Sequence, residues 1–136
     1  MKIVYVEPNK SPITLDIDKD LAVYQGLVEG FIEVVYPFTD NAVLVCNEEG
    51  KCIGLPFNRY LRYDNGEPYD VLMGSFFIVG DDGLGDFCSL TDEQIKKYSA
   101  IFETPDDDTY PNLKDPIVNI TSFDSIDDLL KILYFN

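Results

Sequence analysis

Short segments in which hydrophobic and polar residues alternate recur along the chain, and this alternation is typical of half-buried β-strands. Ile13, Leu15 and Ile17 are separated by polar residues, and residues 2–6 form a comparable apolar segment before them. Turn-forming residues lie between the two segments, so we predict that they pair as a β-hairpin. Further strands are predicted over residues 31–38, 42–46, 51–55, 61–63 and 69–79, with a two-residue hairpin turn at Asn65-Gly66.

The sequence CNEEGKC predicts another hairpin. Asn47 and Gly50 suit the first and last positions of a type I turn that ends in a left-handed glycine. This turn would place Cys46 directly opposite Cys52, whereas a two-residue turn at Glu49-Gly50 would place them on opposite faces of the sheet. We expect both cysteines to be small buried hydrophobic residues, with a redox or metal-binding role as the alternative.

Two segments have the apolar spacing of helices. Residues 18–29 place apolar side chains on one helical face, with Asp18 as the N-cap and Gly30 at the end. Residues 91–103 begin with Thr91 and Gln94, which form the sequence pattern of a capping box. Short hairpin turns cannot make the long crossovers of a parallel sheet. We therefore predict an α+β domain, in which a mostly antiparallel sheet carries both helices on one face.

The composition changes after residue 104, so we divide the chain into a domain over 1–104 and an extension over 105–136. Residues 105–116 are acidic and rich in proline, which predicts a mobile connector. A short strand over 117–121 and a short helix are predicted to follow. The apolar face of this helix must be buried, either on the same domain or on another chain, including a second copy of this one. Leu129, Leu130 and Leu133 lie on that face.

The chain is strongly acidic, with 25 Asp or Glu residues against 10 Lys or Arg residues, a formal charge of −15 and no histidine. Such a surface repels nucleic acid, nucleotides and anionic membranes and attracts basic partners. The absence of histidine removes the commonest general acid-base group and metal ligand. An odd number of cysteines argues against a secreted disulfide framework, and no signal peptide or membrane span is evident. We expect a cytoplasmic protein.

Sequence motifs for catalysis are absent, and we expect no catalytic residues, no metal site and no cofactor. The segment GDDGLGD over 80–86 is interpreted as a solvated loop, with a divalent-cation site as the alternative. Asn58 and Arg59 follow a predicted strand. We expect Arg59 to lock the loop by bonding backbone carbonyls or a carboxylate such as Asp64, and a ligand contact at Asn58 and Arg59 is the alternative.

Several segments carry a resemblance to a known family. They are MKIVYVEPNKSP, LVEGFIEVVYPF, NEEGKCIGLPFNR, GSFFIVG and SLTDEQ, all within residues 1–103. The chain resembles a domain-of-unknown-function family, number 3846, which is carried by phages, plasmids and integrative elements of bacteria. The resemblance implies no activity and no catalytic residues. It implies a setting, in which a small protein of a mobile element acts in the cytosol of a bacterial host.

Charge and setting together predict an anti-defence protein, which binds and inhibits a basic, nucleic-acid-handling host protein and acts as a nucleic-acid mimic. One alternative is a non-enzymatic adaptor that binds through the C-terminal helix, and a third is a ligand-binding protein or an enzyme with a carboxylate-based site. Salt-sensitive binding would favour the first hypothesis and salt-insensitive binding the second. The acids expected to contact the partner are Asp81, Asp82, Asp86, Asp92, Glu93, Asp106, Asp107 and Asp108.

Overall fold

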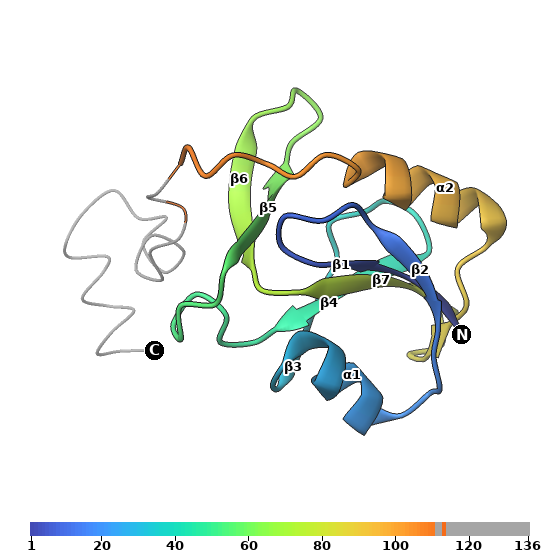
Figure 1. Cartoon of the computed structure of the whole chain (residues 1–136). Helices are drawn as coiled ribbons and strands as arrows, with labels where there is room; N and C mark the ends of the chain where they lie inside the picture. Colours follow the sequence, from blue (N-terminus) through green and yellow to red (C-terminus); the bar gives the residue numbers. More distant parts are fainter. Residues whose placement is uncertain (111–112, 114–136) are drawn as a thin grey trace, which may run out of the picture.

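The fold is an antiparallel main sheet flanked by two helices, with a separate two-stranded sheet at one side (Figure 1). The computed structural model describes residues 1–110 and 113. The main sheet has the strand order β2-β1-β7-β4-β3, with β8 paired to β7, and β5 pairs with β6 in the small sheet. The strands are β1 Lys2–Val6, β2 Ile13–Asp16, β3 Ile32–Val35, β4 Ala42–Asn47, β5 Phe57–Arg62, β6 Pro68–Met73, β7 Phe76–Asp81 and β8 Phe87–Cys88; the helices are α1 Leu21–Val28 and α2 Asp92–Ile101.

The predicted α+β class is confirmed, because every strand pair is antiparallel and two helices accompany the sheet. The β1–β2 hairpin and the capping box of α2 are also confirmed. The placement of both helices on one face was wrong. The packing of Tyr98 and Phe102 with Leu44 puts α2 on one face, and the packing of Tyr24 with Phe77 puts α1 on the other.

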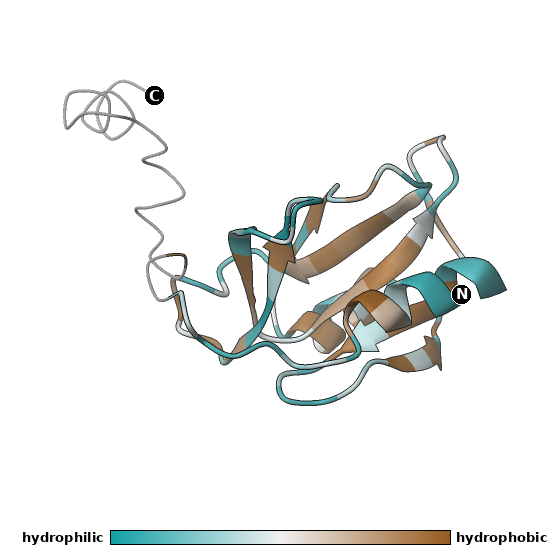
Figure 2. Cartoon of the chain, turned by 90° about the horizontal axis from the view of Figure 1, so that it is seen from above, coloured by the Kyte–Doolittle hydropathy of each residue, from teal (hydrophilic) through white to brown (hydrophobic). Residues whose placement is uncertain are grey.

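The central strands explain why the sheet is covered on both faces. β4 is buried along its whole length, and the first five residues of β7 are buried as well. A strand with continuous apolar residues has no solvent-facing side, so both faces need a covering layer. The strands at the centre of the molecule are accordingly hydrophobic, whereas hydrophilic residues lie in the connecting loops and on α2 (Figure 2).

The predicted hairpin between Cys46 and Cys52 was wrong. β4 is hydrogen-bonded to β3 on one side and to β7 on the other, and Cys46 lies opposite Glu33 of β3. No edge of β4 is left for a hairpin partner, so the chain turns away and the next strand begins at Phe57. Burial raises the pKa of the Cys46 thiol to about 12, which keeps it protonated and unreactive at neutral pH.

The run over 69–79 is two strands and not one. The chain turns at Gly74, which has a left-handed φ of 85°, and β6 and β7 on either side of it belong to different sheets. The predicted hairpin before this run is confirmed, but its loop has three residues because Tyr63 N–H donates to the Glu67 carbonyl. Gly66 occupies the left-handed position of that loop, with a φ of 88°.

The first helix begins two residues later than predicted. Asp20 is its N-cap, since the Asp20 carboxylate accepts a hydrogen bond from Ala22 N–H at 2.9 Å, and Asp18 lies outside the helix. The left-handed residue that ends the helix is Glu29 and not Gly30. Gly30 is required for another reason: a Cβ atom there would lie 2.7 Å from the side-chain nitrogen of Asn47. The predicted C-terminal strand and helix lie outside the described residues.

Candidate functional site

Asn58 joins the small sheet to the main sheet. Its side chain is buried, and Nδ2 donates to the carbonyl of Val6 at 3.0 Å and to the carbonyl of Gly74 at 2.9 Å. The first carbonyl belongs to the last residue of β1, and the second lies in the link between β6 and β7. The side-chain amide therefore fixes both elements against β5.

Arg59 is 1% exposed, and every N–H of its guanidinium group donates to an oxygen of the described residues. Nε and Nη2 donate to the carbonyl of Phe102 at 3.2 and 2.9 Å, and Nη2 also donates to the carbonyl of Lys10 at 2.6 Å. Nη1 donates to Oδ1 of Asn58 at 2.8 Å and to its carbonyl at 3.3 Å. Arg59 thereby bonds backbone carbonyls, as the loop-locking hypothesis predicts, and not the Asp64 carboxylate.

Asn58 and Arg59 together form what we call the buried clamp. A guanidinium group has five N–H donors, and five hydrogen bonds to protein oxygens are present. A ligand could bond Arg59 only by displacing one of these oxygens. Burial lowers the pKa of the Arg59 guanidinium, while the nearby negative charge of Asp106 opposes that shift. The arrangement holds together β5, the β1–β2 loop and the end of α2.

Two further residues before the clamp have structural roles that the sequence did not reveal. Asn47 Nδ2 donates to the carbonyls of Val28 and Glu29 at 3.0 and 3.2 Å, so this side chain caps the C-terminal end of α1. Gly50 lies against β6, where an added Cβ atom would be 2.6 Å from the carbonyl oxygen of Met73. No local pattern identifies such contacts, because both partners of each contact are distant in the sequence.

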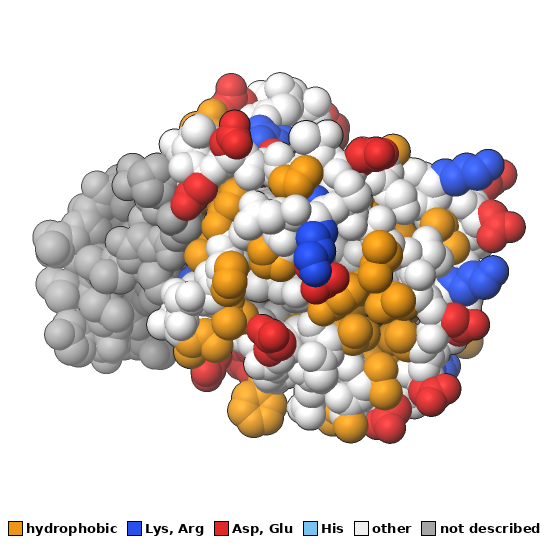
Figure 3. Space-filling model, viewed as in Figure 1, with side chains coloured by type: hydrophobic (Ala, Val, Ile, Leu, Met, Phe, Trp, Pro, Cys, Tyr) orange, Lys and Arg blue, Asp and Glu red, His pale blue; other side chains and the backbone are white. Residues whose placement is uncertain are grey.

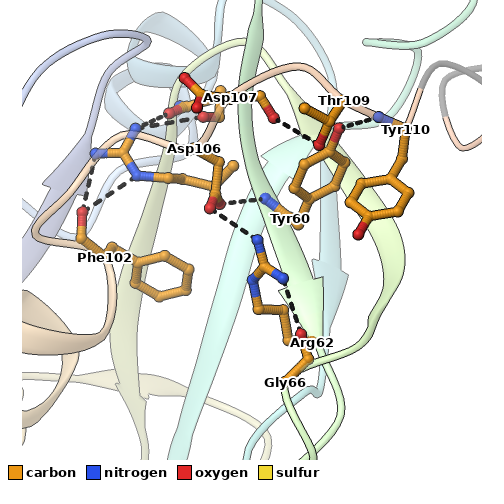
Figure 4. Close-up of polar contacts among 10 residues, drawn as sticks. Tyr60, Arg62, Gly66, Phe102, Asp106, Asp107, Thr109 and Tyr110 are labelled. Atoms are coloured by element: carbon orange, nitrogen blue, oxygen red, sulfur yellow. Dashed lines mark hydrogen bonds and ion pairs between the residues drawn. The ribbon is translucent and has the colours of Figure 1, made fainter.

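Asp106 is held by internal contacts. Its carboxylate accepts the backbone N–H of Tyr60 at 2.9 Å and pairs with Arg62 at 3.0 Å, so it lies between two residues of β5 (Figure 4). Farther along, Tyr110 N–H donates to the Tyr60 hydroxyl at 2.8 Å. The start of the predicted mobile connector is therefore bonded to the small sheet. Asp107, next to Asp106, is exposed.

The remaining predicted acids lie at the other end of α2, and we call this group the acidic end. It consists of Asp81, Asp82 and Asp86 around the β7–β8 loop and Asp92 and Glu93 in the first turn of α2. The ten residues of α2 separate the acidic end from residues 106–108, and such a helix is roughly 15 Å long. The eight predicted acids therefore do not form one surface. Acidic and basic side chains alternate along the right-hand edge of the molecule in Figure 3.

The three acids of the β7–β8 loop also shape that loop. Asp81 accepts the N–H of Gly83 at 3.0 Å, and Asp82 accepts the N–H of Leu84 at 2.7 Å. Asp86 pairs with Lys19 at 2.6 Å, and the hydrogen bond from Lys19 lowers the pKa of the Asp86 carboxyl. The Oδ1 atoms of Asp81 and Asp82 are thus used within the loop, which explains the aspartates at these positions.

The described part of the chain contains no group of three or more His, Cys, Asp or Glu side chains that could hold a metal ion. None of the helices in residues 1–110 is both long enough and apolar enough to cross a membrane. Of the Asp and Glu side chains in these residues, none is buried.

Comparison with known proteins agrees with the resemblance seen in the sequence. No curated protein and no solved structure matches the chain. A family model described as "Domain of unknown function (DUF3846)" matches residues 1–103, which includes both sheets, both helices and the buried clamp. The chain therefore belongs to this family of domains of unknown function.

Proposed function

We propose that this protein binds and inhibits another protein, one that handles nucleic acid and has a basic surface. The observation that supports the proposal is the separation of charge. In residues 1–110 every carboxylate is at least partly exposed, whereas the one buried charged side chain is the cation of Arg59. The fold thus removes a positive charge from a surface whose sequence already has a net charge of −15.

The acidic end is the surface that we propose for this contact. Its carboxylates are carried by a loop and a helix terminus that are anchored to the main sheet, so they are presented without burial of any of them. Carboxylates in such an array can occupy positions on a basic partner that phosphates would take. Charges at the rim of an interface chiefly accelerate association, so the contact should be sensitive to salt.

The setting gives the proposal its biological form. The family resemblance implies a mobile element in a bacterial host, where a protein that blocks a nucleic-acid-binding defence protein would benefit the element. We propose that the protein acts in the host cytosol, without a cofactor and without catalysis. The polar side chains that are buried in the described residues, Asn47, Asn58 and Arg59, all bond to the protein itself, which is consistent with a binding role.

Affinity capture from a bacterial lysate at about 50 and 500 mM salt tests the proposal, followed by binding kinetics with the captured protein. One variant replaces the acidic end with amides, D81N, D82N, D86N, D92N and E93Q. The matched control makes the same change of charge at exposed positions elsewhere, E29Q, E33Q, E48Q, E49Q and E67Q.

We expect a basic nucleic-acid-binding protein that is captured at low salt and released at high salt. The acidic-end variant should associate more slowly than the control variant, and the wild-type chain should block the partner's binding to nucleic acid. A partner whose association rate ignores both salt and the acidic-end changes would contradict the proposal. That result would favour the adaptor hypothesis, with contact through Leu129, Leu130 and Leu133.

A further inference from the structure

An open pocket of about 390 Å³ lies beside the acidic end. It is found on the face of the main sheet that carries α1, where the ends of β3 and β7 and the start of β4 meet. The β7–β8 loop forms one wall of it. Its lining residues are Val34, Tyr36, Val43, Asp81, Gly83, Gly85, Asp86 and Phe87.

The pocket combines apolar and acidic surfaces. Val43 and Val34 provide aliphatic surface from neighbouring strands, and the rings of Tyr36 and Phe87 provide aromatic surface. Tyr36 is 73% exposed, so its ring is accessible to another molecule. The Phe87 ring packs against the Tyr24 ring, with a distance of 5.4 Å between the ring centroids.

The carboxylates of the pocket are fixed in position. Asp81 is oriented by the Gly83 N–H at 3.0 Å, and Asp86 by the Phe87 N–H at 2.9 Å. Each carboxylate is therefore oriented by a neighbouring backbone N–H, next to an aromatic or aliphatic surface. An anionic ligand would be repelled here, and a purely apolar ligand would leave Asp81 without a counter-charge.

We infer that this pocket receives an arginine side chain of the partner protein. An arginine has an apolar stem for the valine surface and a planar guanidinium group that can stack on an aromatic ring and pair with a carboxylate. The pocket volume is near the lower end of the range for small-molecule sites, about 300–1,000 Å³, and suits a side chain. This inference rests on the proposed function and names the group of the partner that would be recognised.

Lys19 provides an internal competitor. Its Nζ lies 2.6 Å from Oδ2 of Asp86, so the chain's own ammonium group already neutralises one of the two acids of the pocket. Both members of this pair are substantially exposed, with side-chain exposures of 47% and 62%, and the pair can exchange with solvent. An incoming arginine would therefore pair with Asp81, and the removal of the Lys19 ammonium group would make Asp86 available for pairing as well.

The test uses the full chain and a small probe, Nα-acetyl-arginine amide, in an NMR titration of backbone amides. Its neutral isostere, Nα-acetyl-citrulline amide, is the matched control. We expect saturable shifts over residues 81–87 with the arginine compound and not with the citrulline compound. D81N and Y36A should each weaken binding by about two- to fivefold, and K19Q should strengthen it by a similar factor. E67Q changes an exposed acid outside both the pocket and the acidic end and should leave the affinity unchanged.

Three results would overturn the inference. Equal shifts with the citrulline compound would indicate a neutral-ligand pocket, and shifts at every exposed acid would indicate unspecific attraction. Shifts over 81–87 that depend on protein concentration, without a probe, would assign the pocket to a second copy of the chain. The two proposals can fail separately. If a basic partner binds Y36A as tightly as the wild type, the proposed function stands and the inference about the pocket is wrong. If the probe binds saturably but no basic partner is found, the inference about the pocket stands and the proposed function is wrong.

Discussion

The buried clamp and the acidic end are both polar, but their surroundings give their charges different consequences. In the clamp, Arg59 is enclosed and its donors are all bonded to protein oxygens. In the acidic end, Asp82, Asp92 and Glu93 remain exposed. A buried polar group affects the stability of the fold strongly, because water cannot replace its lost partners. An exposed charge affects encounter with other molecules more than it affects stability.

This contrast also changes how the segment over residues 47–59 is interpreted. Residues 47–59 contain Asn47, Gly50, Asn58 and Arg59, and the structure gives each of them a contact between elements. A polar motif in a domain of unknown function suggests a site for ligands. Here the side-chain nitrogens of Asn47, Asn58 and Arg59 donate to backbone carbonyls, so these residues join the two sheets and the ends of both helices. The exposed acidic end is the better candidate for contact with other molecules.

The largest expected effect is that of Arg59→Met. This change leaves the carbonyls of Phe102 and Lys10 without their buried donors, and we expect a loss of about 3 kcal/mol in the free energy of unfolding. Urea unfolding followed by far-ultraviolet circular dichroism measures it. Arg62→Met is the control, because Arg62 is 40% exposed and its ion pair should contribute less than about 1 kcal/mol.

Equal losses in these two variants would break the distinction between buried and exposed cations. If Arg59→Met does not fold, Arg59→Lys gives the same comparison. A lysine keeps the charge, but its ammonium has three donors and cannot reach all four acceptor oxygens of Arg59. We therefore expect a stability between that of the wild type and that of a chain without the cation.

Asn58→Leu should have the next largest effect. The substitution keeps a similar volume but removes the donors for the carbonyls of Val6 and Gly74, which costs about 2 kcal/mol. Thermal unfolding by calorimetry is a suitable measurement. Asn41→Leu is the control at an exposed asparagine, and we expect its effect to stay within about 0.5 kcal/mol. If Asn58→Leu lowered the stability no more than Asn41→Leu does, the clamp would not be joining the two sheets.

Asp106→Ala should have an intermediate effect, because this acid is partly buried and holds the backbone of β5. We expect a loss of about 1 kcal/mol and faster hydrogen exchange at the Tyr60 amide, which loses its acceptor. The neighbouring Asp107 is exposed, and Asp107→Ala should leave the exchange rate at Tyr60 unchanged. An unchanged rate in Asp106→Ala would mean that residues 105–110 do not remain on β5.

Conversion of the acidic end to amides should change stability less than any clamp variant. The amides retain the oxygen acceptors that shape the β7–β8 loop, and the loss of like charges relieves repulsion. The urea midpoint, measured at low and at high salt, tests this expectation. If the five amides destabilised the chain as much as Arg59→Met does, the acids would be structural groups and their proposed role in binding would lose its basis.

The smallest expected effect is on the titration of Asp86. The bond from Lys19 lowers the pKa of Asp86, so its stabilising contribution is present above the ordinary carboxyl pKa and is lost as pH falls through the lowered value. Lys19→Gln should raise the pKa of Asp86 toward its ordinary value. The change is measured from the side-chain carboxyl chemical shift of Asp86 between about pH 2 and about pH 6. A pKa that did not move would show that the pair is not formed in solution.

Local signals in the sequence predicted several elements well. Thr91 and Gln94 are the N-cap and N3 residues of α2, so the capping box could be predicted without knowledge of the rest of the fold. The predicted hairpin between Cys46 and Cys52 was wrong because distant strand pairing decided the outcome. Cys46 lies on a strand that is already paired on both sides, and this depends on β3 and β7. The continuous apolar run of β7 did contain the signal for a sheet covered on both faces, and it was interpreted as one long strand with β6.

The candidate site was predicted less well than the fold. Arg59 was identified as a residue that could bond carbonyls, yet Phe102 and Lys10 could not be named as its partners, because they come from other elements. The acids were identified by composition alone. Composition cannot separate Asp106, which is bonded to β5, from the exposed Asp107, because neighbouring residues in one acidic run differ only in what the folded chain brings beside them.

The contact between Asp106 and Tyr60 has a consequence for self-association. β5 has β6 on one side, and on the other side its Tyr60 N–H is occupied by the Asp106 carboxylate. An open strand edge is a template for pairing with another chain, and a carboxylate placed on it acts as a guard against aggregation. The family match ends at residue 103, before this guard. A chain that ended at residue 103 would lack this carboxylate and leave the Tyr60 N–H at the edge of β5 open to pairing with another chain.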